Sequence, residues 1–358
     1  MGLPVTRPES SSATSALRCA LSGPDSNHFN AICLSMQRGA TPHGQSATRA
    51  LDLSSVLTIS PRSFLSSFCL GAQHEPGPVI GGDNQVSREI GGALSATDFP
   101  MEYAAGHADT LQRLRIRSFG VVVTNPDSTV EEDLALLGEM RAIRPGVKSI
   151  VLARQSTADE VIAALRARVF ACFTPPFDPR EIANLARSAA SDSQGLDDIQ
   201  VLSAKPGWVS VRVSCRLITA ERLMTFANEL SARLPEDTRQ EMMQALREIL
   251  LNAMEHGAAF NPDQVVEVTA VRTGRAMVFY VRDPGAGFRR ESLNHAAIAN
   301  PADDPAAHIM QREAEGMRPG GYGLLLAGGT VDELIYSEIG NEVLLIKYVD
   351  SASAVDRP

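Results

Sequence analysis

Residues 245–257 read ALREILLNAMEHG, with Glu248 and Asn252 four positions apart among apolar residues. The apolar residues recur at helical spacing, so this segment is predicted to be a helix that ends at Gly257. Side chains four positions apart lie on one face of a helix. An amide oxygen can bind Mg²⁺ and a carboxylate can take a proton from a nucleophile, so the pair suits phosphate chemistry. By itself, however, such a pair is more often part of a solvated helix face.

A second segment, VRDPGAGF at residues 281–288, places Asp283 after a predicted strand and follows it with Gly285 and Gly287. A carboxylate at the end of a strand can accept a hydrogen bond from a ligand, and glycines let a ligand approach the backbone closely. The same residues also suit an ordinary Asp-Pro-Gly turn. This segment is therefore informative only in combination with others.

A third segment, RPGGYGLLL at residues 318–326, puts Gly321 and Gly323 directly ahead of a predicted apolar helix. Backbone N–H groups and the helix dipole favour phosphate groups at such a position. A glycine cluster alone is as often a simple loop. Coincidence becomes a poor explanation only because all three segments occur, in this order, within one stretch of chain.

The three segments resemble the N box and the two glycine boxes of the GHKL superfamily of ATPases and kinases. Together with GNEVLLIKY at residues 340–348, they look most like the anti-sigma-factor serine/threonine kinase branch of that superfamily. The resemblance covers roughly residues 205–350. It implies a histidine-kinase-like ATPase domain of the two-layer α+β (Bergerat) type that binds ATP and Mg²⁺.

The resemblance also implies a role for each matched residue. Glu248 is the expected general base, Asn252 the expected Mg²⁺ ligand, and Asp283 the expected acceptor for the adenine amino group. Residues 289–319 are the expected lid. One departure concerns the adenine side of the site, where many relatives have threonine and this chain has Asn341. The glycines expected to give room to the nucleotide or contact its phosphates are Gly285, Gly287, Gly321 and Gly323.

The preceding part of the chain alternates short apolar strands with predicted helices of about 10–15 residues. The run 119–124 is β-branched and ends at Asn125-Pro126-Asp127, and further strands are predicted at 149–152 and 169–173. Strands that alternate with helices predict a parallel, doubly wound α/β sheet. By contrast, residues beyond 205 show runs of strands and helices typical of an antiparallel α+β layer.

Residues 77–192 resemble a response-regulator receiver (CheY-like) domain in their pattern but depart from its chemistry. Receivers use a pair of acids for Mg²⁺, an aspartate that accepts phosphate, a threonine or serine, and a lysine. Gly82 replaces one acid, Asp127 is a weak substitute for the acceptor, and Lys148 is the only lysine of the segment. We therefore expect a pseudo-receiver that takes no phosphate; its degenerate positions are Asp83, Asn125, Ala153 and Pro175.

These patterns give a division of the chain into five parts. Residues 1–76 are rich in serine and lack a persistent amphipathic period, so they are predicted to be disordered. The pseudo-receiver at 77–192 is followed by a linker at 193–204, the ATPase domain at 205–350 and a tail at 351–358.

Composition limits the partners and the location. The net charge is −9, which does not suggest a nucleic-acid-binding surface. No apolar stretch is long enough to cross a membrane, and the five cysteines are scattered without a CxxC pair. A cytoplasmic protein without membrane or direct nucleic-acid contacts is therefore expected.

Three functions are compatible with the motifs. The first is a serine/threonine protein kinase of the anti-sigma type that acts on a partner regulator, such as an anti-sigma antagonist or a sigma-factor-like protein. The second is a non-catalytic, ATP-dependent interaction switch, and the third is the catalytic half of a histidine kinase system. His256 is interpreted as a helix-end residue rather than as a phosphoacceptor. A homodimer is expected from the resemblance alone.

Overall fold

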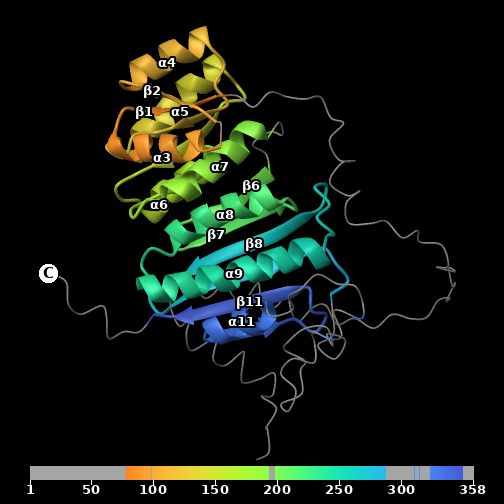
Figure 1. The fold of residues 1–358 in the computed structure, drawn as a ribbon. Coiled ribbons are helices and arrows are strands. Elements are labelled where there is room, and N and C mark those ends of the chain that lie inside the picture. Colours follow the sequence, from red (N-terminus) through yellow and green to blue (C-terminus); the bar gives the residue numbers. More distant parts are fainter. Residues whose placement is uncertain are drawn as a thin grey trace, which may run out of the picture. The chain divides into compact units, whose positions relative to one another are not determined.

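The chain forms two β-sheets with helices packed on them (Figure 1). A computed structural model describes residues 78–97, 99–192, 198–287, 310, 314 and 323–349, and the side chains of 323–326 are not included. The expected disordered segment at 1–76, Gly321 and the tail lie outside the described residues, as does the lid at 289–319 apart from residues 310 and 314.

The first sheet is parallel and has five strands in the order β2-β1-β3-β4-β5. Every neighbouring pair of strands in this sheet is parallel, as the sequence predicted. The order, with the first strand between the second and third, is that of doubly wound flavodoxin-like folds such as CheY. The strands are β1 (Val79–Gly82), β2 (Met101–Ala104), β3 (Val121–Val123), β4 (Lys148–Leu152) and β5 (Ala171–Phe173).

Helices cover both faces of this sheet because successive strand residues point to opposite sides. Val121 and Val123 pack in one cluster with α3 and α7, whereas Val122 between them packs with α4 and α5. All three valines are buried. The helices are α3 (Gln85–Ser95), α4 (His107–Ile116), α5 (Val130–Ile143), α6 (Ala158–Arg166) and α7 (Pro179–Ser191).

Side-chain caps fix where several of these helices begin. Thr129 and Glu132 form a reciprocal capping box at the start of α5, and Thr157 and Glu160 form another at the start of α6. Each box satisfies two backbone N–H groups that a helix start leaves unpaired. The caps also fix the ends of the loops that precede these helices.

The second sheet is antiparallel and has six strands in the order β10-β11-β9-β8-β7-β6. It begins with the hairpin β6–β7, which turns at Gly207, and β8 and β9 form a second hairpin across Gly274. The strands are β6 (Ile199–Lys205), β7 (Trp208–Ser214), β8 (Val265–Arg272), β9 (Ala276–Arg282), β10 (Glu333–Tyr336) and β11 (Glu342–Tyr348).

Three helices pack against this second sheet: α8 (Leu217–Leu230), α9 (Glu236–His256) and α11 (Gly323–Thr330) (Figure 1). Alternate strand residues face the helices, as Val209, Val211 and Val213 do on β7. These residues and the apolar side of α9 share one buried cluster. The second domain is thus the expected α+β arrangement of helices on an antiparallel sheet.

Three elements were not predicted from the sequence. The edge strand β2 and the helix α4 lie in a stretch to which no element was assigned, and α4 has few apolar residues. The predicted linker 193–204 overlaps β6, which is an edge strand with several exposed side chains and a register shift. A short strand with polar, exposed residues is difficult to distinguish from a loop by its pattern alone.

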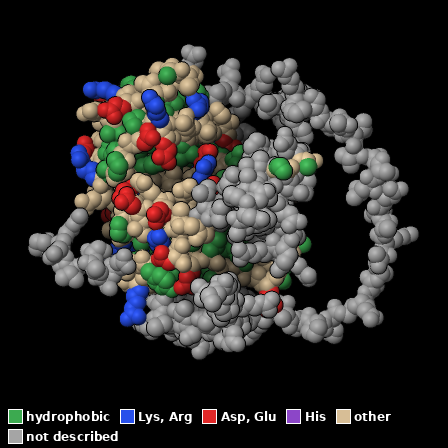
Figure 2. Space-filling model, turned by 60° about the horizontal axis from the view of Figure 1, so that its bottom comes forward, with side chains coloured by type: hydrophobic (Ala, Val, Ile, Leu, Met, Phe, Trp, Pro, Cys, Tyr) green, Lys and Arg blue, Asp and Glu red, His purple; other side chains and the backbone are tan. Residues whose placement is uncertain are grey.

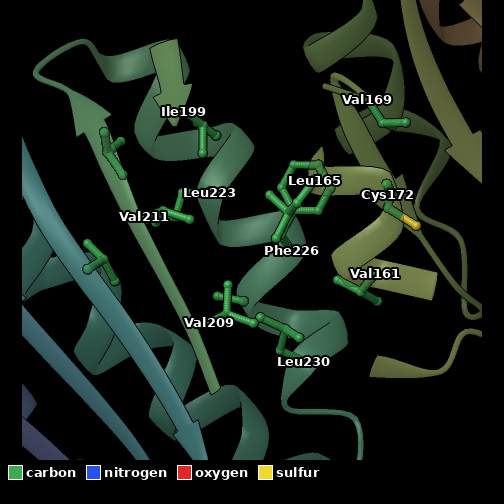
Figure 3. Close-up of a cluster of buried hydrophobic side chains, with 14 of the residues drawn as sticks. Val161, Leu165, Val169, Cys172, Ile199, Val209, Val211, Leu223, Phe226 and Leu230 are labelled. Atoms are coloured by element: carbon green, nitrogen blue, oxygen red, sulfur yellow. The ribbon is translucent and has the colours of Figure 1, made fainter. Parts of the chain in front are cut away.

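The two sheets are joined by a continuous buried cluster (Figure 3). Val161, Leu165 and Cys172 from the first sheet and α6 lie in the same cluster as Leu223 and Phe226 from α8. Helix α8 packs directly against strand β5. The receiver-fold domain and the second domain therefore share apolar core rather than a thin polar contact.

Charged side chains bracket residues 193–197 beside this cluster. Asp192 lies 3.1 Å from Lys148 Nζ and 2.6 Å from Arg216 Nη2, and Arg216 Nη1 lies 2.7 Å from Asp198. Arg222, which is 2% exposed, stacks over the Phe170 ring. Elsewhere the two charge signs are intermixed on the described part of the face shown in Figure 2.

Candidate nucleotide site

Helix α9 brings the first motif into place. Its apolar residues, among them Leu246, Ile249 and Ala253, are buried against the sheet. Glu248 and Asn252 lie one turn apart and are each half-buried. Neither side chain makes a hydrogen bond to another described residue, so both remain available to a ligand.

The end of α9 is pressed against the second motif. A Cβ on Gly257 would lie 2.3 Å from Asp283 Oδ1, which is far inside van der Waals contact. Only glycine therefore fits at this position. The following residues Ala259 and Phe260 both have φ near +50°, and Phe260 N donates to Met254 O at 2.8 Å. The C-terminal end of α9 therefore packs directly against the Asp283 side chain.

Asp283 lies at the end of β9 and is half-buried. Burial raises the pKa of its carboxyl above the usual value, and a hydrogen bond from Gly285 N at 2.8 Å partly opposes that shift. Its own N–H donates to Asn341 O at 3.0 Å. The carboxylate is consequently fixed in one orientation, as an acceptor for a ligand would need to be.

Asn341, which stands where the resemblance leads us to expect threonine, closes the same turn. Its side-chain Nδ2 donates to Gly285 O at 3.4 Å, and its carbonyl accepts from Asp283. The residue therefore supports the loop after β9 from the neighbouring strand end. The substitution retains a polar contact at this place.

The glycines of the second motif are required by the chain itself. Gly287 has φ +76°, and a Cβ there would lie 2.1 Å from Ile339 O. A Cβ on Gly285 would lie 2.8 Å from Asp283 Oδ1. Close packing within the protein thus explains both glycines before any ligand is considered.

The third motif is only partly within the described residues. Gly323 begins α11, as expected for a glycine ahead of a helix. Gly321 falls outside the part of the chain that the structure describes, as does the predicted lid apart from residues 310 and 314. Their relation to Asn252 and Asp283 therefore stays a prediction.

One residue near this site was not anticipated from the sequence. Cys215 is fully buried after β7, and burial together with the nearby charge of Asp283 raises the pKa of its thiol to about 11. The thiol therefore stays neutral and serves as a small apolar side chain. A lone cysteine after a strand gives no sequence signal of such a position.

The degenerate receiver positions lie at the C-terminal ends of the strands of the first sheet. Asp83 pairs with Arg88 at 2.7 Å, and both side chains are largely exposed. Asn125 uses its side chain to accept from Asp127 N at 3.2 Å within its own loop. Asp127 in turn accepts from Arg154 Nε at 2.8 Å. The carboxylates of Asp83 and Asp127 therefore each already have an arginine partner.

The other two degenerate positions offer no charged group. Ala153 is buried after β4, and Pro175 follows β5 and is joined to Pro176 by a cis peptide bond. Lys148 stands at the start of β4, at the opposite end of the parallel sheet from Asn125, so it cannot replace the missing lysine. Among the described residues, no group of three or more His, Cys, Asp and Glu could hold a metal ion.

Comparison with known proteins identifies the second domain. Residues 213–347 match the family model of the histidine kinase-like ATPase domain. The chain thus consists of a receiver-fold domain followed by a histidine kinase-like ATPase domain. No curated protein matches the chain in sequence. None of the described helices is both long enough and apolar enough to cross a membrane.

Two solved structures similar to the first domain are distant in sequence. A CheY-like receiver domain protein from Methanospirillum hungatei is 19% identical, covers 30% of this chain and 88% of its own, and has a TM-score of 0.28. A response regulator from Thermotoga maritima is also 19% identical, with coverages of 32% and 99% and a TM-score of 0.30. The assignment of the receiver fold accordingly rests on the strand order and not on these scores.

Proposed function

We propose that the C-terminal domain binds ATP with Mg²⁺ between α9, the loop after β9 and the start of α11. The observation that carries this proposal is the contact between α9 and Asp283. A half-buried carboxylate is held in one orientation against the last turn of the helix that bears Glu248 and Asn252. Structural packing alone does not require an acceptor of this kind at the end of a strand.

Each expected residue has a role in this proposal. Asp283 accepts a hydrogen bond from the adenine amino group, and Asn252 supplies an oxygen to Mg²⁺. Gly321 and Gly323 are the proposed phosphate contacts, since N–H groups at the start of a helix favour negative charge. When bound, Mg²⁺ neutralises charge that develops on the phosphate oxygens. The residues present fit a nucleotide, because carboxylate, amide and helix start offer complementary groups.

We further propose that the domain is a serine/threonine protein kinase of the anti-sigma type. The hydroxyl oxygen of a partner protein attacks the γ-phosphorus of ATP, its proton passes to the Glu248 carboxylate, and ADP leaves with the electrons of the broken P–O bond. Glu248 is half-buried and makes no hydrogen bond to another described residue, so it is free to accept this proton. Such proton transfer typically contributes about 10²–10⁴-fold to a rate.

Calorimetric titration with Mg-ATP tests the binding step. Wild-type protein is expected to bind, whereas Asn252→Ala and Asp283→Ala are expected to weaken binding strongly. Asp263→Ala is the matched control, since Asp263 is exposed in the loop before β8. Absence of binding by the wild-type protein would refute the proposal.

Phosphorylation of a candidate partner tests the transfer step. Glu248→Gln keeps the size of the side chain and is expected to bind ATP normally but to lose phosphoryl transfer. Unchanged transfer in this variant would refute the assignment of the base. An acid-labile product would instead indicate phosphohistidine, and the protein would then be the catalytic half of a histidine kinase system.

A second candidate function is favoured by the first domain. Its two acids at the strand ends are paired with arginines, and the side chain of Asn125 is used within its own loop. One domain of this chain lacks the residues for phosphoryl transfer. The other domain could likewise bind ATP without transferring phosphate, and ATP binding would then serve to alter a protein interface. Nucleotide-dependent binding of a partner without any phosphorylation would favour this switch over the kinase.

We propose a protein as the partner, in the class of anti-sigma antagonists or sigma-factor-like regulators, and a homodimer as the assembly. Support for both comes from the resemblance to the anti-sigma branch. Sedimentation with and without ATP measures the assembly directly. A monomer under both conditions would refute the dimer while leaving the nucleotide site untouched.

A further inference from the structure

Glu229 on α8 is an unusual buried anion at the junction of the two domains. Glu229 is 4% exposed, and no described Lys, Arg or His forms an ion pair with its carboxyl group. A buried carboxylate is costly unless hydrogen bonds replace its lost hydration. The donors that do so must therefore explain why this residue is tolerated.

All the donors come from the receiver-fold domain. Thr174 gives both its N–H, at 3.1 Å, and its hydroxyl, at 2.9 Å, and Ser156 gives its hydroxyl at 3.0 Å. Thr174 follows β5 and Ser156 lies in the loop after β4. These loops carry Ala153 and Pro175, which occupy two of the degenerate receiver positions. One carboxylate thus holds both loops at the same edge of the parallel sheet.

Further contacts join α8 to the same domain. Arg222, two turns earlier on α8, donates from Nε to Phe170 O at 3.1 Å and stacks over the Phe170 ring. Ile218 packs into the apolar cluster formed by α3 and α7. The position of α8 is therefore set from the receiver-fold side along its length.

Helix α8 also packs against α9, which carries Glu248 and Asn252. Phe226 and Leu230 of α8 share a buried cluster with Leu246 of α9. Close-packed helices transmit displacement, because cores have little free volume to absorb it. The loops after β4 and β5 are in this way connected to the helix of the nucleotide site by two successive packed contacts.

We propose that Glu229 is a positioning residue through which the receiver-fold domain sets the place of α9 and regulates the nucleotide site. The part that concerns nucleotide affinity rests on the proposed ATP binding. In this arrangement the first domain acts through hydrogen bonds to its two loops and needs no phosphate. Any ligand or partner that moves these loops alters the nucleotide site through α8.

Three variants of the full-length chain separate this role from simple stability. Glu229→Ala removes the acceptor. Glu229→Gln restores it, because its carbonyl accepts from Thr174 N while its amide donates to the hydroxyl oxygens of Ser156 or Thr174. Glu221→Ala is the control, since Glu221 is exposed on the same helix.

Hydrogen exchange measured by mass spectrometry is the first readout. Glu229→Ala is expected to exchange faster in the loops after β4 and β5 and also in the second half of α9, whereas Glu229→Gln and Glu221→Ala match the wild type. The second readout is calorimetric ATP affinity, which is expected to fall about tenfold in Glu229→Ala and to recover in Glu229→Gln.

The two readouts distinguish the failure of this proposal from the failure of the proposed function. Wild-type protein that binds no ATP would refute the nucleotide site, yet the exchange of α9 would still decide the role of Glu229. A folded Glu229→Ala variant with unchanged exchange in α9 would overturn that role. If Glu229→Ala does not fold, Ser156→Ala combined with Thr174→Val removes two donors instead, and the same outcomes apply.

Discussion

Ionisation of the buried Asp133 is expected to lower the unfolding free energy of the protein as the pH rises, and replacement of Asp133 by asparagine is expected to abolish this loss. Asp133 lies in the first turn of α5 and is fully buried. Its Oδ1 is 2.7 Å from Ser128 Oγ and 3.8 Å from His107 Nε2, while Oδ2 makes no hydrogen bond to a described residue. Ser128 Oγ also lies 2.6 Å from Asn125 O.

The number of available protons decides which of these groups donates in each hydrogen bond. Ser128 has one hydroxyl proton and therefore cannot donate to Asn125 O and to Asp133 at once. Both short contacts are satisfied if Asp133 carries a proton and donates it to Ser128 Oγ. Burial raises the pKa of Asp133 from 3.8 to about 6, against the opposing effects of the nearby Thr124 and Ser128 hydroxyls and of the charge on His107. The geometry and the raised pKa agree that the folded protein holds this proton more tightly than the unfolded chain does.

The sign and size of the effect follow from this shift. The folded state binds the proton more tightly than the unfolded state, so Asp133 favours folding below pH 3.8 and progressively ceases to do so up to about pH 6. A pKa difference of about 2 corresponds to about 3 kcal/mol of unfolding free energy lost across this range. Asparagine has a similar shape and cannot ionise, so the variant is expected to escape this loss.

The assay is urea unfolding of wild-type protein and Asp133→Asn at several pH values from about 3.5 to about 7, a window chosen to span the transition. The difference between the two free energies isolates Asp133 from the other carboxyls. Asp263→Asn, at an exposed position, is the control and is expected to follow the wild type. A constant difference across the range would refute the reasoning, as would a variant that is less stable only at the high-pH end.

Three further predictions concern packing and phosphate chemistry. Gly257→Ala is expected to displace the carboxylate at the end of β9 and weaken ATP binding by about tenfold or more in calorimetry, whereas Gly274→Ala, with open space around it, has no effect. Equal binding by both variants would contradict the role of the close contact. Phe226→Ala, at the domain junction, is expected to cost about 3–5 kcal/mol in urea unfolding, and Leu217→Ala, exposed on the same helix, less than about 0.5 kcal/mol. Similar costs for the two would show that the junction is not core. After incubation with a small phosphodonor, mass spectrometry is expected to find no phosphate on the first domain. A phosphate on Asp127 would instead show that this domain keeps the phosphate-accepting chemistry of a receiver.

Much of the architecture could be predicted because the decisive residues are local. The β-branched run at 121–123 and the apolar spacing within α9 each report an element without reference to the rest of the chain. The edge strands β2 and β6 were missed because β2 is only four residues long and the exposed residues of β6 follow no simple period. Pairing with a neighbouring strand, rather than local pattern, gives these segments their structure.

The candidate site shows the same division. Glu248, Asn252 and Asp283 are marked by spacing and by resemblance, and the structure places Asp283 against the end of α9. The importance of Glu229 has no local signal, since its donors lie 55 and 73 positions earlier in the chain. A glutamate among apolar helix residues could equally have been a solvent-facing one, and only the tertiary fold distinguishes the two cases.

The junction between the sheets has a consequence for the solubility of the separate domains. Strand β5 is an edge of the first sheet and packs against α8, while β6 is an edge of the second sheet and receives a hydrogen bond from Arg166 to Ala204 O at 2.7 Å. Exposed strand edges are templates for aggregation. Each domain thus contacts an edge strand of the other, and separation of the two domains at this junction is expected to expose both strands further and to favour aggregation of the fragments.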